Sequence, residues 1–287
     1  MGKSPKEFQE YILPESELGN LPRITLTEYM ESPAVAFLRY CVHAHYAISF
    51  VRKHISSQEE KDKNAEARKG RKPDIAIRKS RLAIISAAML PAIMGHFETF
   101  QKSLFAGIFE ITPYLKTFDI KKFDKTLSKD IGVEIRVERI AGYRGRDVFP
   151  GIIVAEHLGG WHTPKQVNRY FKILLNVEPF DTHQASQLEV LWQLRHSIVH
   201  TAGILTPPDA QKISILQKWV NHYLVFEEPF ISEVARKMHC VTKKMVERVN
   251  KAFEGQMHED TPTEIVQRAK KLFKVTSPIS SWLKECS

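Results

Sequence analysis

The stretch DTHQASQLEVLWQLRHSIVHTAG, residues Asp181–Gly203, holds the most unusual combination of side chains in the sequence. Asp181 or Thr182 can cap the start of a helix here, because a short side-chain oxygen accepts hydrogen bonds from the free amides of the first turn. Gly203 suits the left-handed turn that commonly ends a helix. The sequence therefore predicts one helix between these residues, with the rest of the chain as its scaffold.

One face of this predicted helix is apolar. At about 100° per residue, that face collects Leu188, Leu191, Trp192, Ile198 and Val199. Arg195 lies in the middle of the same face. A guanidinium group stays charged, so on an apolar face it needs a carboxylate, a phosphate or a water-filled cleft. We therefore expect Arg195 to face a partner of opposite charge.

The flank beside this arginine is polar. Glu189, Gln193, His196 and His200 recur there at helical spacing, which places two imidazoles one turn apart. Arg195 and His200 are five positions apart and would diverge by roughly 140° on an unbroken helix. They converge only if the last turn unwinds before Gly203, or if two chains bring their helix ends together.

Size and charge limit the classes of protein that fit. The chain has 287 residues, of which 43% are hydrophobic, and this is ordinary for a globular protein of one large or two small domains. The formal net charge is +9 and the isoelectric point is near 9.3. Such a surface attracts polyanions. The charge supports a nucleic-acid partner without selecting one.

The cysteines and apolar runs bear on location. Cys41, Cys240 and Cys286 have neither paired nor metal-type spacing, so we expect no disulfide framework and no zinc site, as in a reducing compartment. The first thirty residues lack the apolar run of a signal peptide. The longest apolar stretch, Leu82–Gly95, is shorter than a membrane span needs and contains Pro91. The predicted location is cytoplasmic, without a membrane.

Hydrophobic periodicity and capping signals divide the rest of the chain into elements. Helices are predicted at 33–55, 75–110, 118–129, 152–158, 164–175, 229–253 and 263–274. A charged loop is predicted at 58–74, a short strand at 133–140 and a turn at 205–211, while 213–226 is ambiguous between strand and helix. Strand and helix do not alternate regularly, so we predict an all-α helical bundle with minor strand content.

The predicted organisation has four parts. An N-terminal arm covers 1–31, a helix and charged loop cover 32–73, the main helical domain covers 74–255, and a short helix and tail cover 256–287. Within the main domain, Glu98 interrupts an otherwise apolar helix. An acidic residue in that position usually faces solvent, but it is also the natural candidate to pair with Arg195.

Several kinds of chemistry find no support in the sequence. There is no glycine-rich phosphate loop, no H-E-x-x-H and no cluster of cysteine and histidine with metal-ligand spacing. His196 and His200 alone lack the further ligands that a divalent ion needs. We therefore expect neither a metal nor another cofactor.

The hexapeptide RHSIVH, from Arg195 to His200, resembles the R-x4-6-H motif of the HEPN superfamily of higher-eukaryote and prokaryote nucleotide-binding domains. The resemblance includes the polar His196, the apolar pair before His200 and a following glycine. The segment around Glu98 is similar to the helix in which members place an acidic residue. The chain looks most like the RiboL-PSP-type HEPN group, over roughly 74–253, although the spacing also recurs by chance from Arg39 to His45.

This resemblance implies an endoribonuclease that needs no metal, in a toxin or antiphage-defence role. An imidazole exchanges protons near neutral pH, so His200 would take the proton from a ribose 2′-hydroxyl. Arg195 would neutralise charge on the phosphate. His196 would make a second phosphate contact or protonate the leaving oxygen, and Glu98 would orient Arg195. HEPN members pair as dimers with their motifs facing one cleft, which implies a homodimer.

Besides a nucleotidyl or adenylyl acceptor in a two-gene toxin–antitoxin pair, two other readings remain open from the sequence. The first is a non-catalytic HEPN module that binds nucleic acid or nucleotide as a sensor or as the partner of another protein. The second is a helical interaction protein whose basic face meets an acidic partner. A cognate antitoxin or defence-system protein is a further possible partner.

Overall fold

The computed structural model describes residues 24–67, 75–132, 149–227 and 229–286. Over these ranges the fold is all-α, as predicted. The α-helices are α2 (Leu26–Glu31), α3 (Pro33–Ala67), α4 (Ile75–Ile111), α5 (Ile120–Thr126), α7 (Pro150–His157), α8 (Pro164–Leu175), α9 (Thr182–His200), α10 (Pro207–Gln211), α11 (Phe230–Glu254), α12 (Thr263–Leu272) and α13 (Ser280–Lys284). Short single turns are η2 (Thr112–Tyr114), η3 (Leu127–Ile131) and η4 (Ser214–Trp219).

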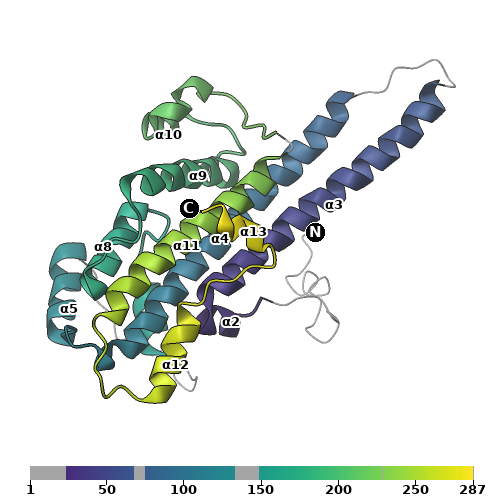
Figure 1. Ribbon diagram of the computed structural model, residues 1–287. Coiled ribbons are helices and arrows are strands. Elements are labelled where there is room, and N and C mark those ends of the chain that lie inside the picture. Colours follow the sequence, from purple (N-terminus) through teal and green to yellow (C-terminus); the bar gives the residue numbers. More distant parts are fainter. Residues whose placement is uncertain (1–23, 68–74, 133–148, 228, 287) are drawn as a thin grey trace, which may run out of the picture.

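Helix α4 is the central element of the bundle. It packs against α2, α3, α7, α8, α9, α11 and α12 (Figure 1). Its apolar residues support this role, because Leu90, Phe97, Phe100 and Phe105 are all fully buried. The helix continues through Pro91 without interruption.

Helix α3 runs beside α4 and reaches further than predicted. It continues to Ala67, through the first part of the predicted charged loop at 58–74. That prediction was wrong for 58–67 because those residues are mainly glutamate, lysine, glutamine and alanine, which favour helix even without a core to pack against. Residues 68–74 lie outside the described residues. In Figure 1 the outer ends of α3 and α4 project beyond the other helices.

The N-terminal part of the chain also differs from a simple surface arm. Thr25 caps α2, with Glu28 completing a reciprocal capping box. Tyr29 on this helix is buried and its hydroxyl lies 2.8 Å from the Nδ1 atom of His96. Residues 26–31 therefore pack on the bundle, whereas 1–23 lie outside the described residues.

Strand content is limited to two isolated bridges among the described residues, Leu115 with Met257 and Ile204 with Tyr223. The strand predicted at 133–140 lies outside the described residues. The turn predicted at 205–211 contains the short helix α10, and η4 covers much of the ambiguous 213–226 stretch. Both elements lie in the connection between α9 and α11.

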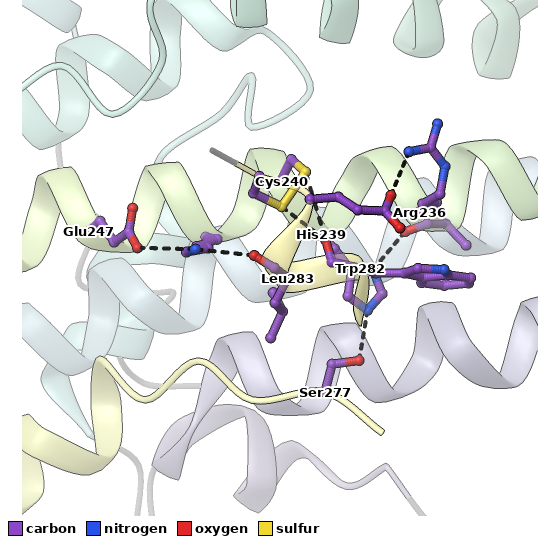
Figure 2. The surroundings of a disulfide bond; sticks show 11 residues. Arg236, His239, Cys240, Glu247, Ser277, Trp282 and Leu283 are labelled. Carbon is purple, nitrogen blue, oxygen red and sulfur yellow. Dashed lines mark hydrogen bonds and ion pairs between the residues drawn. A yellow bond between two sulfur atoms is a disulfide. The ribbon is translucent and has the colours of Figure 1, made fainter. Parts of the chain in front are cut away.

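The C-terminal end is fastened to α11, which corrects the cysteine prediction. Cys240 on α11 forms a disulfide with Cys286, so the expectation that no cysteines pair was wrong (Figure 2). Arg236 forms an ion pair with Glu285 at 2.9 Å, and the ammonium group of Lys243 donates to the carbonyl oxygen of Leu283 at 3.1 Å. Together these contacts hold the last turn of the chain across the middle of α11.

Two described stretches, 33–55 and 81–114, are long and apolar enough to cross a membrane by length and composition alone. The expectation that no apolar segment reaches such a length was therefore wrong, because α4 extends its apolar face well past Gly95. Both stretches also place many side chains in the core. Core helices commonly meet the same criterion, so it is weak support for a membrane span.

Candidate functional site

Helix α9 has the boundaries that its sequence predicts. The carboxylate of Asp181 accepts from the backbone amide of Gln184 at 2.8 Å, and the Gln184 side chain accepts from the amide of Asp181. At the other end, the amide of Gly203 donates to the carbonyl oxygen of Ser197 at 2.9 Å. Gly203 has a φ of +81°, which a residue with a side chain rarely adopts. The cap and the glycine turn fix where the motif at 195–200 lies.

The buried face of α9 differs in part from the predicted apolar face. Leu188 and Trp192 are buried as expected, but Val199 is 46% exposed. Gln193 and Ser197 are buried instead. Leu191 and Ile198 are partly buried against the core, so the departure is confined to Val199, which the packing of α9 against α4 and α8 leaves uncovered. The predicted apolar face was therefore wrong at Val199.

Arg195 lies at the edge of this buried face. Its side chain is partly buried, and its Nε atom is buried without a hydrogen-bond acceptor among the described residues. The indole nitrogen of Trp192, one turn earlier, is also buried and has no acceptor within the described part of the chain. Within the described parts of the chain, Arg195 makes no hydrogen bond or ion pair. A charged donor in this setting requires an acceptor from elsewhere.

Glu98 does not supply that acceptor. It lies on α4, which packs against α9, but its carboxylate pairs with the ammonium group of Lys102 at 2.6 Å. The expected ion pair between Glu98 and Arg195 is not found among the described residues. Lys102 is four positions along the same helix, so this local pair forms without any tertiary requirement.

The two histidines of the motif are brought together as predicted. The ring centroids of His196 and His200 are 4.7 Å apart. His200 is exposed, whereas His196 is partly buried and its Nε2 atom lies 3.8 Å from a carboxylate oxygen of Asp209. The last turn of α9 therefore carries a row of three ionisable groups that runs from Asp209 through His196 to the exposed His200.

Asp209 was not among the residues that the sequence singled out. Its carboxylate is buried at 5% exposure, accepts from Thr206 at 2.9 Å and pairs with Lys212 at 2.8 Å. Burial alone would raise the pKa of Asp209, but the hydrogen bonds from Lys212 and Thr206 and the nearby positive charges outweigh it and lower the pKa. The Thr206-Pro-Pro-Asp209 pattern is a helix-capping signal that would have placed this carboxylate in a first turn.

The connection at 201–227, which carries α10, folds back on itself beyond the end of α9 (Figure 1). The Leu224 amide donates to the Gly203 carbonyl at 2.8 Å. The ring of Tyr223 lies so close that a methyl group placed on Gly203 would be 3.0 Å from it. This connection therefore lies directly beside the end of the helix that carries His200.

The helix itself stays regular up to His200. The last turn does not unwind, so one of the two predicted routes to convergence of Arg195 and His200 is absent. The other route, a second copy of the chain, is the one that this geometry leaves open.

A cavity of about 900 Å³ among the described residues lies elsewhere. It is bounded by α5, α8 and Gln256, and neither Arg195 nor His200 lines it. Among the described residues, no group of three or more histidine, cysteine or carboxylate side chains is arranged to hold a metal ion. At the end of α9, Val199 and His200 are exposed.

Comparisons with protein families, with curated proteins and with solved structures found no match.

Proposed function

We propose that this protein is an endoribonuclease of the HEPN type that needs no metal, in a toxin or antiphage-defence role. The observation that carries the proposal is the end of α9, where a buried and unpaired Arg195 donor lies on the same two turns as the His196–His200 pair. Brought to one phosphate by two copies of the chain, an unpaired guanidinium and an exposed imidazole would provide a phosphate contact and a proton acceptor together. The basic net charge of +9 favours RNA as the partner.

Each side chain has a defined part in the proposed reaction. His200 takes the proton from a ribose 2′-hydroxyl, and the oxygen then attacks the adjacent phosphorus. The bond from phosphorus to the 5′-oxygen breaks, and that oxygen receives a proton. Arg195 neutralises the phosphate oxygens as phosphorus becomes five-coordinate. The products are a 2′,3′-cyclic phosphate and a 5′-hydroxyl.

His196 fits the role of the proton donor to the leaving oxygen. The carboxylate of Asp209 lies 3.8 Å from its Nε2 atom. Glu98 has no part in this version of the site, because it is paired with Lys102. Asp209 takes the place of Glu98 as the acidic residue that supports the site.

The separation of Arg195 and His200 around α9 favours a homodimer. On a regular helix these residues point roughly 140° apart. Two copies that bring their α9 ends together would place Arg195 of one copy near His200 of the other. A cognate antitoxin or defence-system protein would then be expected to cover this groove.

The same separation favours a second candidate function, a non-catalytic HEPN module that binds nucleic acid or nucleotide. Such a module needs Arg195 to bind an anion, but it does not need His200 to face the same phosphate. It would bind RNA tightly and leave it intact.

The test is cleavage of total RNA in the presence of EDTA. We expect the wild-type protein to cleave RNA and to leave DNA intact, because DNA lacks the attacking hydroxyl. His200→Ala and Arg195→Ala should each abolish cleavage. His183→Ala, at the exposed first turn of the same helix, is the matched control and should retain full activity.

Two results would overturn the proposed reaction. One is full activity of either the His200 or the Arg195 variant, and the other is cleavage that requires Mg2+. Light scattering tests the dimer, and a strict monomer at micromolar concentration would remove the shared groove.

A further inference from the structure

The connection at 201–227 turns an unusual number of apolar side chains outward. Leu205, Ala210, Leu216 and Leu224 fasten it to the core. The exposed large apolar side chains of this connection are Ile204, Ile215, Trp219, Tyr223 and Val225, and Val199 of α9 is exposed as well. Several exposed apolar side chains in one connection commonly mark a binding surface.

Two aromatic rings dominate this surface. Trp219 is 49% exposed and Tyr223 is 52% exposed. The ammonium group of Lys218 lies 5.3 Å from the centre of the Trp219 ring, and the His222 ring meets Trp219 edge-on at 6.5 Å. We call Lys218, Trp219, His222 and Tyr223 the aromatic platform.

The platform adjoins the proposed catalytic residues. Tyr223 packs over Gly203, only three residues after His200. Asp209, from the same connection, lies beside His196. A ligand that covers the platform therefore extends toward the end of α9.

The charge around the platform selects the class of ligand. Between 199 and 225 the only acidic residue is Asp209, which is buried and paired with Lys212. Lys218, His200 and His222 are exposed. Flat exposed rings combined with positive charge match a ligand that has both planar rings and negative charge.

We propose that the aromatic platform binds single-stranded RNA by stacking unpaired bases on Trp219 and Tyr223, with Lys218 contacting the phosphate backbone. This inference rests on the proposed function, and it names the form of RNA that the same site takes. Every unpaired base offers a flat face to an aromatic side chain, whereas a duplex hides those faces between its own base pairs. A single strand bound to the platform would therefore extend toward His200.

The test measures binding in the His200→Ala background, where RNA stays intact. The probes are a fluorescently labelled unstructured RNA and the same strand annealed into a duplex. Trp219→Ala and Tyr223→Ala should each weaken binding of the single strand by about fivefold or more. Trp219→Phe, which keeps a ring, should retain most of the affinity.

The matched control is an exposed aromatic residue on another helix. Phe50 on α3 is 72% exposed, and in Figure 1 helices α4 and α11 lie between α3 and α10. Phe50→Ala should leave RNA binding unchanged. Circular dichroism of each variant verifies that the fold is retained.

The outcomes separate this inference from the proposed function. If the protein binds no RNA, both fall. If RNA binds and is cleaved but the two platform variants bind it normally, or if duplex binds as tightly as single strand, the platform is wrong and the nuclease stands. If the platform variants lose binding while wild-type protein never cleaves RNA, the platform stands and the nuclease falls. If the variants only lower the mass measured by light scattering, the surface is a contact between copies, which overturns the platform.

Discussion

Removing the Cys240–Cys286 disulfide should lower the free energy of unfolding by up to about 4 kcal/mol at 25 °C. The bond joins residues 46 positions apart, and closing a loop of that length removes about 13 cal/mol/K of entropy from the unfolded chain. For a chain of 287 residues, such a loss corresponds to a decrease in Tm of about 7 °C.

The contacts around the disulfide should keep the folded state intact without it. Trp282 packs edge-on against His239 at 4.9 Å, and Arg236 pairs with Glu285 (Figure 2). The sulfur of Cys286 lies 3.0 Å from the carbonyl oxygen of Trp282, which would accept from the reduced thiol. The loss should therefore appear in the stability of the fold and leave its helical content unchanged.

The assay is urea unfolding of wild-type protein and of the double variant Cys240→Ser/Cys286→Ser, each with and without dithiothreitol. Wild type should lose stability on reduction, whereas the double variant should be indifferent to the reductant. The reasoning is refuted if oxidised wild type and the double variant unfold at the same urea concentration. It is also refuted if mass spectrometry after alkylation finds both thiols free. Disulfides are uncommon in the cytosol, so the result also bears on the predicted cytoplasmic location.

Three further predictions concern packing and pH. A methyl group at Gly151 would lie 2.3 Å from the carbonyl oxygen of Ala106. Gly151→Ala should therefore displace α7 from α4 and lower the free energy of unfolding by about 3 kcal/mol. Gly95 has open space around it in mid-helix, so Gly95→Ala should raise the free energy of unfolding by about 1 kcal/mol. Equal urea midpoints for the Gly151 and Gly95 variants would contradict this account. Burial lowers the pKa of His239 in the folded protein, so the unfolded chain binds the proton more readily. The stability that the neutral His239 contributes is present above about pH 6.5 and is lost as the pH falls. His239→Gln should therefore flatten the dependence of the urea midpoint on pH. An unchanged slope would rule out His239 as the cause.

The fold was predictable where local signals coincide with packing. The boundaries of α8 and α9 follow from a cap, a proline or a glycine turn beside an apolar period. The helix at 58–67 was missed because a run of polar and charged residues with only two alanines carries no hydrophobic period. The disulfide was missed because two cysteines far apart in sequence meet only through the docking of the chain end on α11.

The candidate site was predictable only in part. The neighbouring rings of His196 and His200 follow directly from helical spacing. The partner of Glu98 did not follow from helical spacing alone, because Lys102 one turn away competes with any residue on another helix. Asp209 and the aromatic platform lie near the end of α9 because of the way the 201–227 connection folds. A helical period in the sequence does not predict how a connection folds.

The central position of α4 has a consequence for how this protein can change over evolution. Removing one residue from the middle of α4 would rotate everything beyond it by about 100° and shift it by about 1.5 Å. Helices from both halves of the chain pack on α4, so all of them would lose their match at once. Differences in length among homologues should therefore gather in connections such as 201–227, while the helical frame around α4 stays constant.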